Sequence, residues 1–383
     1  MKRLLSLFLA VLTVVSLFAL RGGLPVGAET PILYGDAKSV ILIEAATGQV
    51  LYEYEADLRL PPASVTKIMT ILLVMEELAK GTLKLTDTVQ VSENAAAMGG
   101  SQVYLKAGEL MSVEDLLKSV VVASANDAST ALAEHVAGSV ETFVSRMNTR
   151  AEELGMVNTK FENPTGLDDS VTEHLTSARD IALMSRELMK HEAVLAYTTI
   201  WMDTIRDGAF GLTNTNRLIR FYAGANGLKT GSTSKAGFCI SAAAKRDGMQ
   251  LIAVVMGSST RDSRNETAKR LLDYGFANYK YLLMESGELP PIAVLGGVSD
   301  TCRLMFGRFD LVLDKSSPQL ETVISLPETI AAPVRAGDTV GRIEYRLGEK
   351  AVGAVDIIAA ETIEKISFFG LLKKMIAAFF LHA

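Results

Sequence analysis

The chain has 383 residues, which is more than one typical domain holds and suits two. Hydrophobic residues make up 49% and charged residues 21%, a composition typical of a globular protein with a large core. The net charge of -6 provides no basic excess to neutralise phosphates, which argues against a nucleic-acid partner. The two cysteines, Cys239 and Cys302, rule out a disulfide framework and a four-cysteine zinc site.

The N-terminus has the pattern of an export signal. The basic start Lys2-Arg3 precedes an apolar run over residues 4–20, and the small residues 26–28 offer a cleavage site before Glu29. The apolar run is slightly long for a signal, so an uncleaved membrane anchor is the alternative. In either case we expect the folded part to work outside the cytoplasm.

Two short β-rich runs, 39–44 and 49–53, open the folded part and predict an antiparallel hairpin. Two prolines then precede Ser64, and a helix-forming apolar run follows it as far as Gly81. Proline suits the edge of a helix and glycine its far end, so we expect Ser64 at a helix start. Lys67 lies three residues further on and shares a helix face with Ser64.

The pair Ser64 and Lys67 has the outline of a nucleophile and its base. A hydroxyl at a helix N-terminus feels the positive end of the helix dipole, and a nearby amine can take its proton if burial lowers the pKa of the amine. Alone the pattern is weak, because Ser-x-x-Lys is expected about once by chance in a chain of this length. A second copy indeed runs from Ser232 to Lys235 in a turn-rich stretch. The alternative for Ser64 is an N-cap serine beside a solvated lysine.

The middle of the chain is predicted to be mostly helical. Residues 82–91 look extended, and Ser112 opens a helix with capping-box spacing that runs to about residue 122. The polar loop 123–127 separates this helix from the next, which ends near residue 137. A short polar loop between buried helices must find partners for its side chains. The alternative is that Ser124 or Asn126 simply caps the second helix.

Further elements follow in the order helix, turn, helix, mixed segment, two strands and helix, with Lys229 on or beside a strand edge. Strands at both ends of a helical stretch predict an α+β fold, in which early and late strands meet in an antiparallel sheet beside a helical cluster. In chain order, the predicted ranges are 139–155 for the first helix, 163–167 for the turn, 174–189 for the second helix, 200–216 for the mixed segment, 237–244 and 251–257 for the two strands, and 265–281 for the last helix.

From about Glu288 the character of the chain changes. Pro290-Pro291 is predicted to mark a boundary, and alternating runs with regular turn signals predict a small all-β module, to which we assign no chemistry. Residues 366–382 have helical periodicity, with an apolar face opposite Lys373 and Lys374. This helix is a poor membrane span and fits one lying in the membrane interface; the alternative is a helix docked on the protein's own core. The predicted ranges are 1–28 for the signal, 29–284 for the first domain, 285–363 for the β-rich domain and 364–383 for the anchor helix.

Three short motifs occur in the order Ser-x-x-Lys, Ser-x-Asn and Lys-Thr-Gly, and this combination marks penicillin-binding proteins and serine β-lactamases. Each residue has a use in acyl transfer. We expect Ser64 to attack a carbonyl and Lys67 to accept its proton. Ser124 can relay a proton to the leaving amine, and Asn126 can hydrogen-bond the substrate amide.

The third motif is predicted to bind the substrate. Lys229 and Thr230 supply a charge and a hydroxyl for a terminal carboxylate, and Gly231 belongs to the same strand edge. Backbone N–H groups of Ser64 and Ser232 would form an oxyanion hole, which is typically worth about 3 kcal/mol.

With these motifs the chain resembles the low-molecular-weight D-alanyl-D-alanine carboxypeptidases over essentially its full length. The stretches 163–167, 214–216 and 227–239 add to the resemblance, as do the β-rich domain and the terminal helix. The resemblance implies a β-lactamase/transpeptidase-like domain and removal of the terminal D-alanine from peptidoglycan pentapeptides through an acyl-enzyme on Ser64. It also implies slow-turnover acylation by penicillins, a role in cell-wall synthesis and remodelling, and no metal or other cofactor.

Two details depart from the family pattern or stay open. Ser232-Thr233 follows Lys-Thr-Gly where some members carry a bulkier residue. Members often hold the substrate carboxylate with an arginine near Asn214, and here Arg217 and Arg220 are both candidates. The four histidines form no metal-binding pair at i, i+4 spacing and are interpreted as structural; they are His135, His174, His191 and His382.

Three alternative functions share this site. A β-lactamase of the same fold needs an added base for deacylation and would not need the β-rich module or the terminal helix. A penicillin-binding scaffold or sensor would not need a nucleophile with its base. Transpeptidase or endopeptidase activity shares the acyl-enzyme and differs only in the acceptor.

Overall fold

The computed structural model describes residues 31–168 and 172–381. The predicted export signal, 1–28, lies outside the described residues. The elements below all belong to one compact unit, Tyr34–Ala383.

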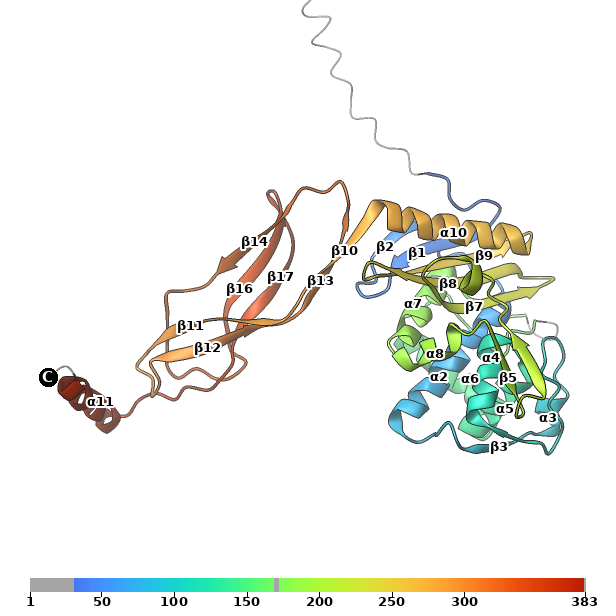
Figure 1. The fold of residues 1–383 in the computed structure, drawn as a ribbon, viewed down its shortest axis with the longest axis horizontal. Helices are drawn as coiled ribbons and strands as arrows, with labels where there is room; N and C mark the ends of the chain where they lie inside the picture. Colours follow the sequence, from blue (N-terminus) through green and yellow to red (C-terminus); the bar gives the residue numbers. More distant parts are fainter. Residues whose placement is uncertain (1–30, 169–171, 382–383) are drawn as a thin grey trace, which may run out of the picture. The chain divides into compact units, whose positions relative to one another are not determined.

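The central sheet has five strands in the order β2-β1-β9-β8-β7 and is antiparallel throughout. The strand β1, which opens the hairpin, pairs with β9, the last of the five strands along the chain, from Ser39 opposite Met256 to Glu44 opposite Leu251. This confirms the predicted α+β fold, in which early and late strands meet (Figure 1). The strands are β1 Ser39–Glu44, β2 Val50–Tyr54, β7 Ala225–Thr233, β8 Gly237–Arg246 and β9 Met249–Ser258.

Helices cover both faces of this sheet. The helix α10 (Arg261–Asn278) packs against β8 and β9, and α7 (Ala178–Met189) packs against β1 and β9 from the other side (Figure 1). Every residue of β1 is therefore buried, as its unbroken run Ser39–Glu44 of mostly apolar side chains requires.

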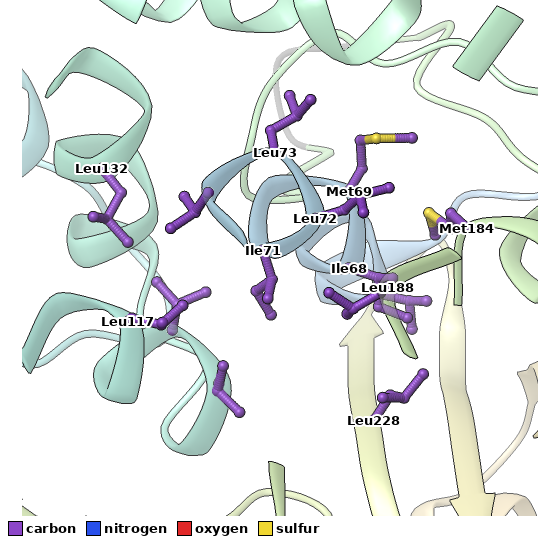
Figure 2. Packing of buried hydrophobic residues seen from close by; sticks show 14 of the residues in the cluster. Ile68, Met69, Ile71, Leu72, Leu73, Leu117, Leu132, Met184, Leu188 and Leu228 are labelled. Atoms are coloured by element: carbon purple, nitrogen blue, oxygen red, sulfur yellow. The ribbon is translucent and has the colours of Figure 1, made fainter. Parts of the chain in front are cut away.

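The helix α2 (Lys67–Lys80) is the centre of the helical cluster, and α4, α5, α6 and α7 all contact it. Its residues are buried without a break from Lys67 to Met75, because neighbours surround the helix on all sides. Figure 2 shows Ile71 and Leu72 packed among side chains of neighbouring elements. The other helices of the cluster are α3 Glu93–Ala96, α4 Val113–Val122, α5 Asn126–Ala137 and α6 Val140–Glu153.

Side-chain caps explain where two predicted helix boundaries were wrong. The helix α7 begins at Ala178 and not at residue 174, because the Ser177 hydroxyl accepts a hydrogen bond from the Asp180 backbone N–H. The helix α10 begins at Arg261 and not at residue 265, because Thr260 caps it in the same way. It ends at Asn278, and the residues up to 281 belong to strand β10.

Short elements complete this part of the chain. The predicted extended run 82–91 is a strand only at β3, which pairs with β4, and the mixed segment 200–216 contains the hairpin β5–β6. These elements are β3 Thr88–Gln90, β4 Leu110–Ser112, β5 Met202–Ile205, β6 Phe210–Thr213, η2 Glu192–Val194, α8 Leu195–Thr198 and α9 Leu218–Phe221.

The C-terminal module is all-β, as predicted. Six strands form a sheet in the order β14-β16-β17-β12-β11-β15, and β10 pairs with β13. Its small core includes Cys302, Leu304, Ile343 and Ile357. The strands are β10 Tyr279–Met284, β11 Gly287–Leu295, β12 Thr301–Phe306, β13 Phe309–Asp314, β14 Leu320–Ser325, β15 Thr329–Ala331, β16 Thr339–Leu347 and β17 Lys350–Ala359.

At this end of the chain, the structure contradicts the predicted boundary at Pro290-Pro291 and contains the predicted terminal helix. Pro290-Pro291 lies inside β11, where the ladder with β12 shifts register between Leu289 and Ile292, so the two prolines do not separate two elements. The domain ranges themselves stay a prediction. The terminal helix is α11 (Phe368–Leu381). Among the described residues, no helix has the length and apolar character to cross a membrane.

Candidate active site

Ser64 lies in a single 3-10 turn, η1 (Ala63–Thr66), that leads directly into α2. Two glycines let other segments approach this turn closely. A Cβ at Gly231 of β7 would lie 2.8 Å from the backbone nitrogen of Ser64, and a Cβ at Gly166 would lie 1.8 Å from the carbonyl oxygen of Ala63. Gly166 also has a φ of +83°, which favours glycine. The Ser64 turn is therefore held between the sheet edge and the 163–167 loop.

The Lys67 amine lies at the centre of the candidate site. Its Nζ is 3.0 Å from the Ser64 Oγ, 2.6 Å from the Asn126 Oδ1 and 2.7 Å from the Thr165 carbonyl oxygen. Burial and the charge of Lys229 hold the pKa of Lys67 well below its usual value, against the opposing effect of Asp127. A neutral amine has two N–H donors for the two carbonyl oxygens and one lone pair for the Ser64 hydroxyl.

The loop 123–127 joins α4 to α5. The helix α5 begins at Asn126 with Ala125 as its N-cap and no side-chain cap, so the alternative that Ser124 or Asn126 caps it is wrong. The Asn126 Nδ2 instead donates to the Gly99 carbonyl at 2.7 Å, which turns its Oδ1 toward Lys67. Ser124 has a φ of +62° and lines the adjoining cavity.

Asp127 is a site residue that the sequence reasoning missed. Its buried carboxylate accepts hydrogen bonds from the backbone N–H groups of Val103, Leu105 and Ala128. It thereby fixes the loop that precedes β4 and whose residues contact Asn126. The available signal was an acidic residue in the first turn of α5, a position where carboxylates are common for the helix dipole alone.

The turn 163–167 was predicted, but its contact with Lys67 was not. The Asn163 Oδ1 accepts hydrogen bonds from the backbone N–H groups of Thr165 and Gly166 at 3.1 and 2.7 Å. The Pro164 carbonyl accepts the hydroxyls of Thr70 and Ser129. These bonds orient the Thr165 carbonyl toward the Lys67 amine, a role for the backbone that residue types alone do not reveal.

The strand β7 forms the edge of the sheet, as expected for the Lys-Thr-Gly motif. Lys229 is buried, and its Nζ donates to the Thr230 carbonyl at 3.0 Å. Burial and the nearby charge of Arg264 lower the pKa of Lys229 to about 7. The Thr230 hydroxyl donates to the Thr215 hydroxyl at 2.8 Å. Among the described residues, neither Lys229 nor Arg264 forms an ion pair. Their positive charge is therefore free to bind an anion in this part of the site.

A cavity of about 450 Å³ opens in front of these groups. It brings together the three predicted motifs, because Ser64, Ser124, Thr230, Gly231 and Ser232 all line it. Lys67, Asn126 and Lys229 are buried behind that lining. Sequence reasoning missed several further lining residues, which come from loops, from the strands β6 and β8 and from α10 and carry no local motif; they are Ser101, Trp201, Thr213, Phe238, Arg261 and Arg264.

The structure distinguishes Arg217 from Arg220, the two arginines that the sequence offered as candidates for holding the substrate carboxylate. Arg217 lines the cavity, whereas the guanidinium of Arg220 lies over the rings of Trp201 and Phe221, at 5.6 and 5.7 Å from their centroids. The second Ser-x-x-Lys copy is not a pair: Ser232 lines the cavity, but the Lys235 amine donates to the Asp168 carbonyl.

His174 has a structural position beneath the Ser64 turn. Its Nδ1 accepts the Glu162 backbone N–H at 2.9 Å, so its Nε2 donates to the Thr66 hydroxyl at 2.8 Å. Burial lowers the pKa of His174 to about 4, which keeps the ring neutral. In the described part of the chain, no group of three metal-ligating side chains lies together.

Two known protein families match this chain, each along a different segment. The D-alanyl-D-alanine carboxypeptidase family, peptidase S11, matches residues 27–260. The C-terminal domain of penicillin-binding protein 5 matches residues 310–365.

Individual relatives match along most of their length. The chain is 40% identical to the D-alanyl-D-alanine carboxypeptidase DacF of Bacillus subtilis, over 98% of either chain. It is 34% identical to DacC of Escherichia coli, over 88% of this chain and 86% of that protein. Penicillin-binding protein 5 from Haemophilus influenzae superimposes with a TM-score of 0.77 at 30% identity, over 88% of this chain and 100% of that one. Penicillin-binding protein D2 from Listeria monocytogenes, in its ampicillin-bound form, superimposes with a TM-score of 0.59 at 32% identity, over 64% of this chain and 100% of that one.

Proposed function

The chain belongs to the D-alanyl-D-alanine carboxypeptidase family, and from that premise we propose that Ser64 is the nucleophile with which it removes the terminal D-alanine of peptidoglycan pentapeptides. It is a serine-type hydrolase of the cell wall. The observation that carries the proposal is the 3.0 Å distance between the Ser64 Oγ and the fully buried Lys67 Nζ. A buried amine with a lowered pKa can accept a proton at neutral pH.

The acylation step follows from this geometry. The Ser64 Oγ attacks the carbonyl carbon of the penultimate D-alanine while Lys67 takes the hydroxyl proton. The bond to the terminal D-alanine breaks, and its nitrogen receives a proton through the Ser124 hydroxyl. Water then hydrolyses the ester on Ser64. The Asn126 amide keeps one N–H beyond its bond to Gly99, which suits a hydrogen bond to the substrate amide.

The substrate's terminal carboxylate is proposed to bind at the strand edge. Lys229 and Arg264 supply positive charge that no described carboxylate neutralises, and the Thr230 hydroxyl faces the same cavity. Arg217, which also lines the cavity, is preferred to Arg220. The backbone N–H groups of Ser64 and Ser232 would stabilise the oxyanion, and Gly231 allows the strand to lie this close.

Penicillins are proposed to acylate the same serine. Penicillin-binding protein D2, a structural neighbour, was solved with ampicillin and with cefotaxime bound. A β-lactam presents a reactive amide and a carboxylate to the same groups as the peptide. The adduct is expected to persist, in contrast to that of a β-lactamase.

Export and peripheral attachment are also proposed. The segment 1–28 would direct the chain across the cytoplasmic membrane, and α11 would lie in the outer face of that membrane. Phe368, Phe369 and Met375 of α11 are 75%, 80% and 62% exposed, which favours insertion into an interface over docking on the protein's own core. The domain ranges 29–284, 285–363 and 364–383 belong to this proposal.

The test uses the full chain in detergent with a peptide ending in D-Ala-D-Ala. Free D-alanine is measured beside the intact mass after exposure to penicillin, with Ser64→Ala as the control. Release of D-alanine and a persistent adduct, both lost in Ser64→Ala, support the proposal. An adduct without D-alanine release indicates a sensor or a transpeptidase, and rapid drug hydrolysis without an adduct indicates a β-lactamase; either result contradicts the proposal.

A further inference from the structure

A strained contact away from Ser64 joins two loops. The first is the segment 98–108 between α3 and β4, here called the cleft loop. The second is the turn 206–209 of the β5–β6 hairpin. Tyr104 and Arg206, which meet at this contact, have φ values of 57° and 55°, although neither is a glycine. Non-glycine residues keep such a conformation only where their surroundings hold them, and such residues gather at functional sites.

The Arg206 side chain makes the contact. Its Nε donates to the Glu109 Oε1 at 2.6 Å, and its Nη2 donates to the Glu109 Oε2 at 3.2 Å. Its Nη1 donates to the Val103 carbonyl at 2.9 Å, and its Nη2 also reaches the Tyr104 carbonyl at 3.3 Å. The guanidinium lies over the Phe210 ring of its own hairpin, 5.5 Å from the ring centroid. One arginine fork thus ties the hairpin to the backbone of the cleft loop.

Both tied segments reach the cavity in front of Ser64. Ser101 of the cleft loop lines that cavity, and Trp201 and Thr213 line it from the base of the hairpin. The cleft loop has a second attachment, because Asp127 accepts the Val103 and Leu105 backbone N–H groups. Val103 is therefore held at its N–H by the helix α5 and at its carbonyl by the hairpin.

The Arg206 side chain does not touch the reacting groups. Lys67 is held by Ser64, Asn126 and the Thr165 carbonyl, none of which contacts the Arg206 side chain. The Asn126 backbone N–H donates to the Ser101 carbonyl at 2.7 Å, an attachment that needs no arginine. The arginine therefore contacts the segments beside the cavity and not the reacting groups at its base.

We propose that Arg206 is a positioning residue that fixes the cleft loop against the β5–β6 hairpin and thereby selects an extended peptide over a compact acylating agent. The inference rests on the proposed function, since it assumes that both compounds acylate Ser64. A stem peptide continues beyond the residue that is attacked and must lie between both walls. A penicillin is compact and needs only the reacting groups around Ser64. Loss of the contact between Arg206 and the cleft loop should therefore weaken binding of the peptide and leave the chemical step intact.

The experiment compares Arg206→Ala with Arg150→Ala in the full chain. Arg150 is the matched control, because its side chain is 22% exposed, as that of Arg206 is, and forms ion pairs with three carboxylates away from the cavity. For Arg206→Ala we expect kcat/KM for a D-Ala-D-Ala peptide to fall about tenfold, mainly through KM. The rate of penicillin acylation, followed by intact mass, should change by less than about twofold. Arg150→Ala should leave the ratio of the two rates unchanged.

The outcomes are distinguishable. A fall of both rates by one common factor, or no change in either, overturns the inference, because general destabilisation would affect peptide and drug alike. If Arg206→Ala does not fold, Arg206→Lys takes its place; it keeps the charge opposite Glu109 but loses the fork to the two carbonyls, and it should shift the ratio in the same direction. An unchanged ratio in that variant also overturns the inference. Absence of D-alanine release by the unaltered protein would instead contradict the proposed function.

Discussion

The α+β part and the β-rich module bury different kinds of side chain. The first buries charged groups; Lys67, Asp127, Lys229 and Arg264 gather at or behind one cavity, whereas Glu44 and Asp180 are buried away from it. In the described strands β10 to β17, every buried side chain is apolar, cysteine or tyrosine, and none is charged. Because burying a charge is costly unless partners hold it, a cluster of buried charges indicates a site with a chemical purpose. The predictions below test this contrast.

The largest effect is expected at the nucleophile. Ser64→Ala removes the attacking oxygen and should lower D-alanine release by at least about a thousandfold. The fold should be retained, since among the residues that the structure describes the Ser64 side chain is hydrogen-bonded only to Lys67. Rates are measured with the peptide, and thermal unfolding is the control; activity within about tenfold of the original would show that another residue is acylated.

Gly166→Ala should be nearly as damaging, but through the backbone. The added Cβ would lie 1.8 Å from the Ala63 carbonyl oxygen, so the Ser64 turn and the 163–167 loop must move apart. We expect a loss of stability on the order of 3 kcal/mol together with most of the activity. Gly81→Ala, also at a left-handed position but with open space around it, is the matched control. Equal losses in the two variants would contradict the close contact.

Lys229 should make stability depend on pH. Its folded pKa is about 7 and its ordinary value is 10.5, so between these values the unfolded chain binds the extra proton. Stability should therefore rise with pH across this window, by up to about 1.4 kcal/mol per unit from Lys229 alone, and this part of the rise should be lost in Lys229→Met, which keeps the contribution of Lys67. Urea unfolding at pH 7 and pH 8.5 measures it. A rise of equal size in both proteins would place the titration elsewhere.

Peptide turnover should respond in the opposite direction. The substrate carboxylate needs a charged Lys229, so kcat/KM should fall as pH rises above about 7. The measurement is kcat/KM for the D-Ala-D-Ala peptide over the same pH range. A rate that is flat there would contradict a charged lysine at the carboxylate site.

The smallest effect on activity is expected in the β-rich module. Ile357→Ala removes a fully buried side chain from its core and should cost about 2–4 kcal/mol of that module's stability. D-alanine release in detergent should stay within about twofold, because no charged side chain is buried in the described strands of the module. A large loss of turnover without unfolding would mean that the module contributes to the site.

The sequence predicted the fold and most residues around Ser64 because their signals are local. The apolar run after Ser64 predicts α2, and the β-rich runs predict the strands that pair in the central sheet. The starts of α7 and α10 were missed, because a capping hydroxyl from Ser177 or Thr260 decides them and many serines and threonines do not cap.

Other parts of the site have no local signal. The contact between the Thr165 carbonyl and Lys67 joins residues far apart in the chain and uses the backbone. Arg264 reaches the cavity from α10 only because that helix packs on β8 and β9. Such contacts follow from the assembled fold and not from residue types or their spacing.

The central claim is that burial holds Lys67 ready to accept the Ser64 proton. The most direct measurement is the titration of the Lys67 side chain by NMR with lysine labelled at the ε-carbon, its signal assigned by its loss in Lys67→Arg. We predict a midpoint well below the ordinary value of 10.5. A midpoint near 10.5 would mean that the amine is charged at neutral pH, and it would contradict a role as the base.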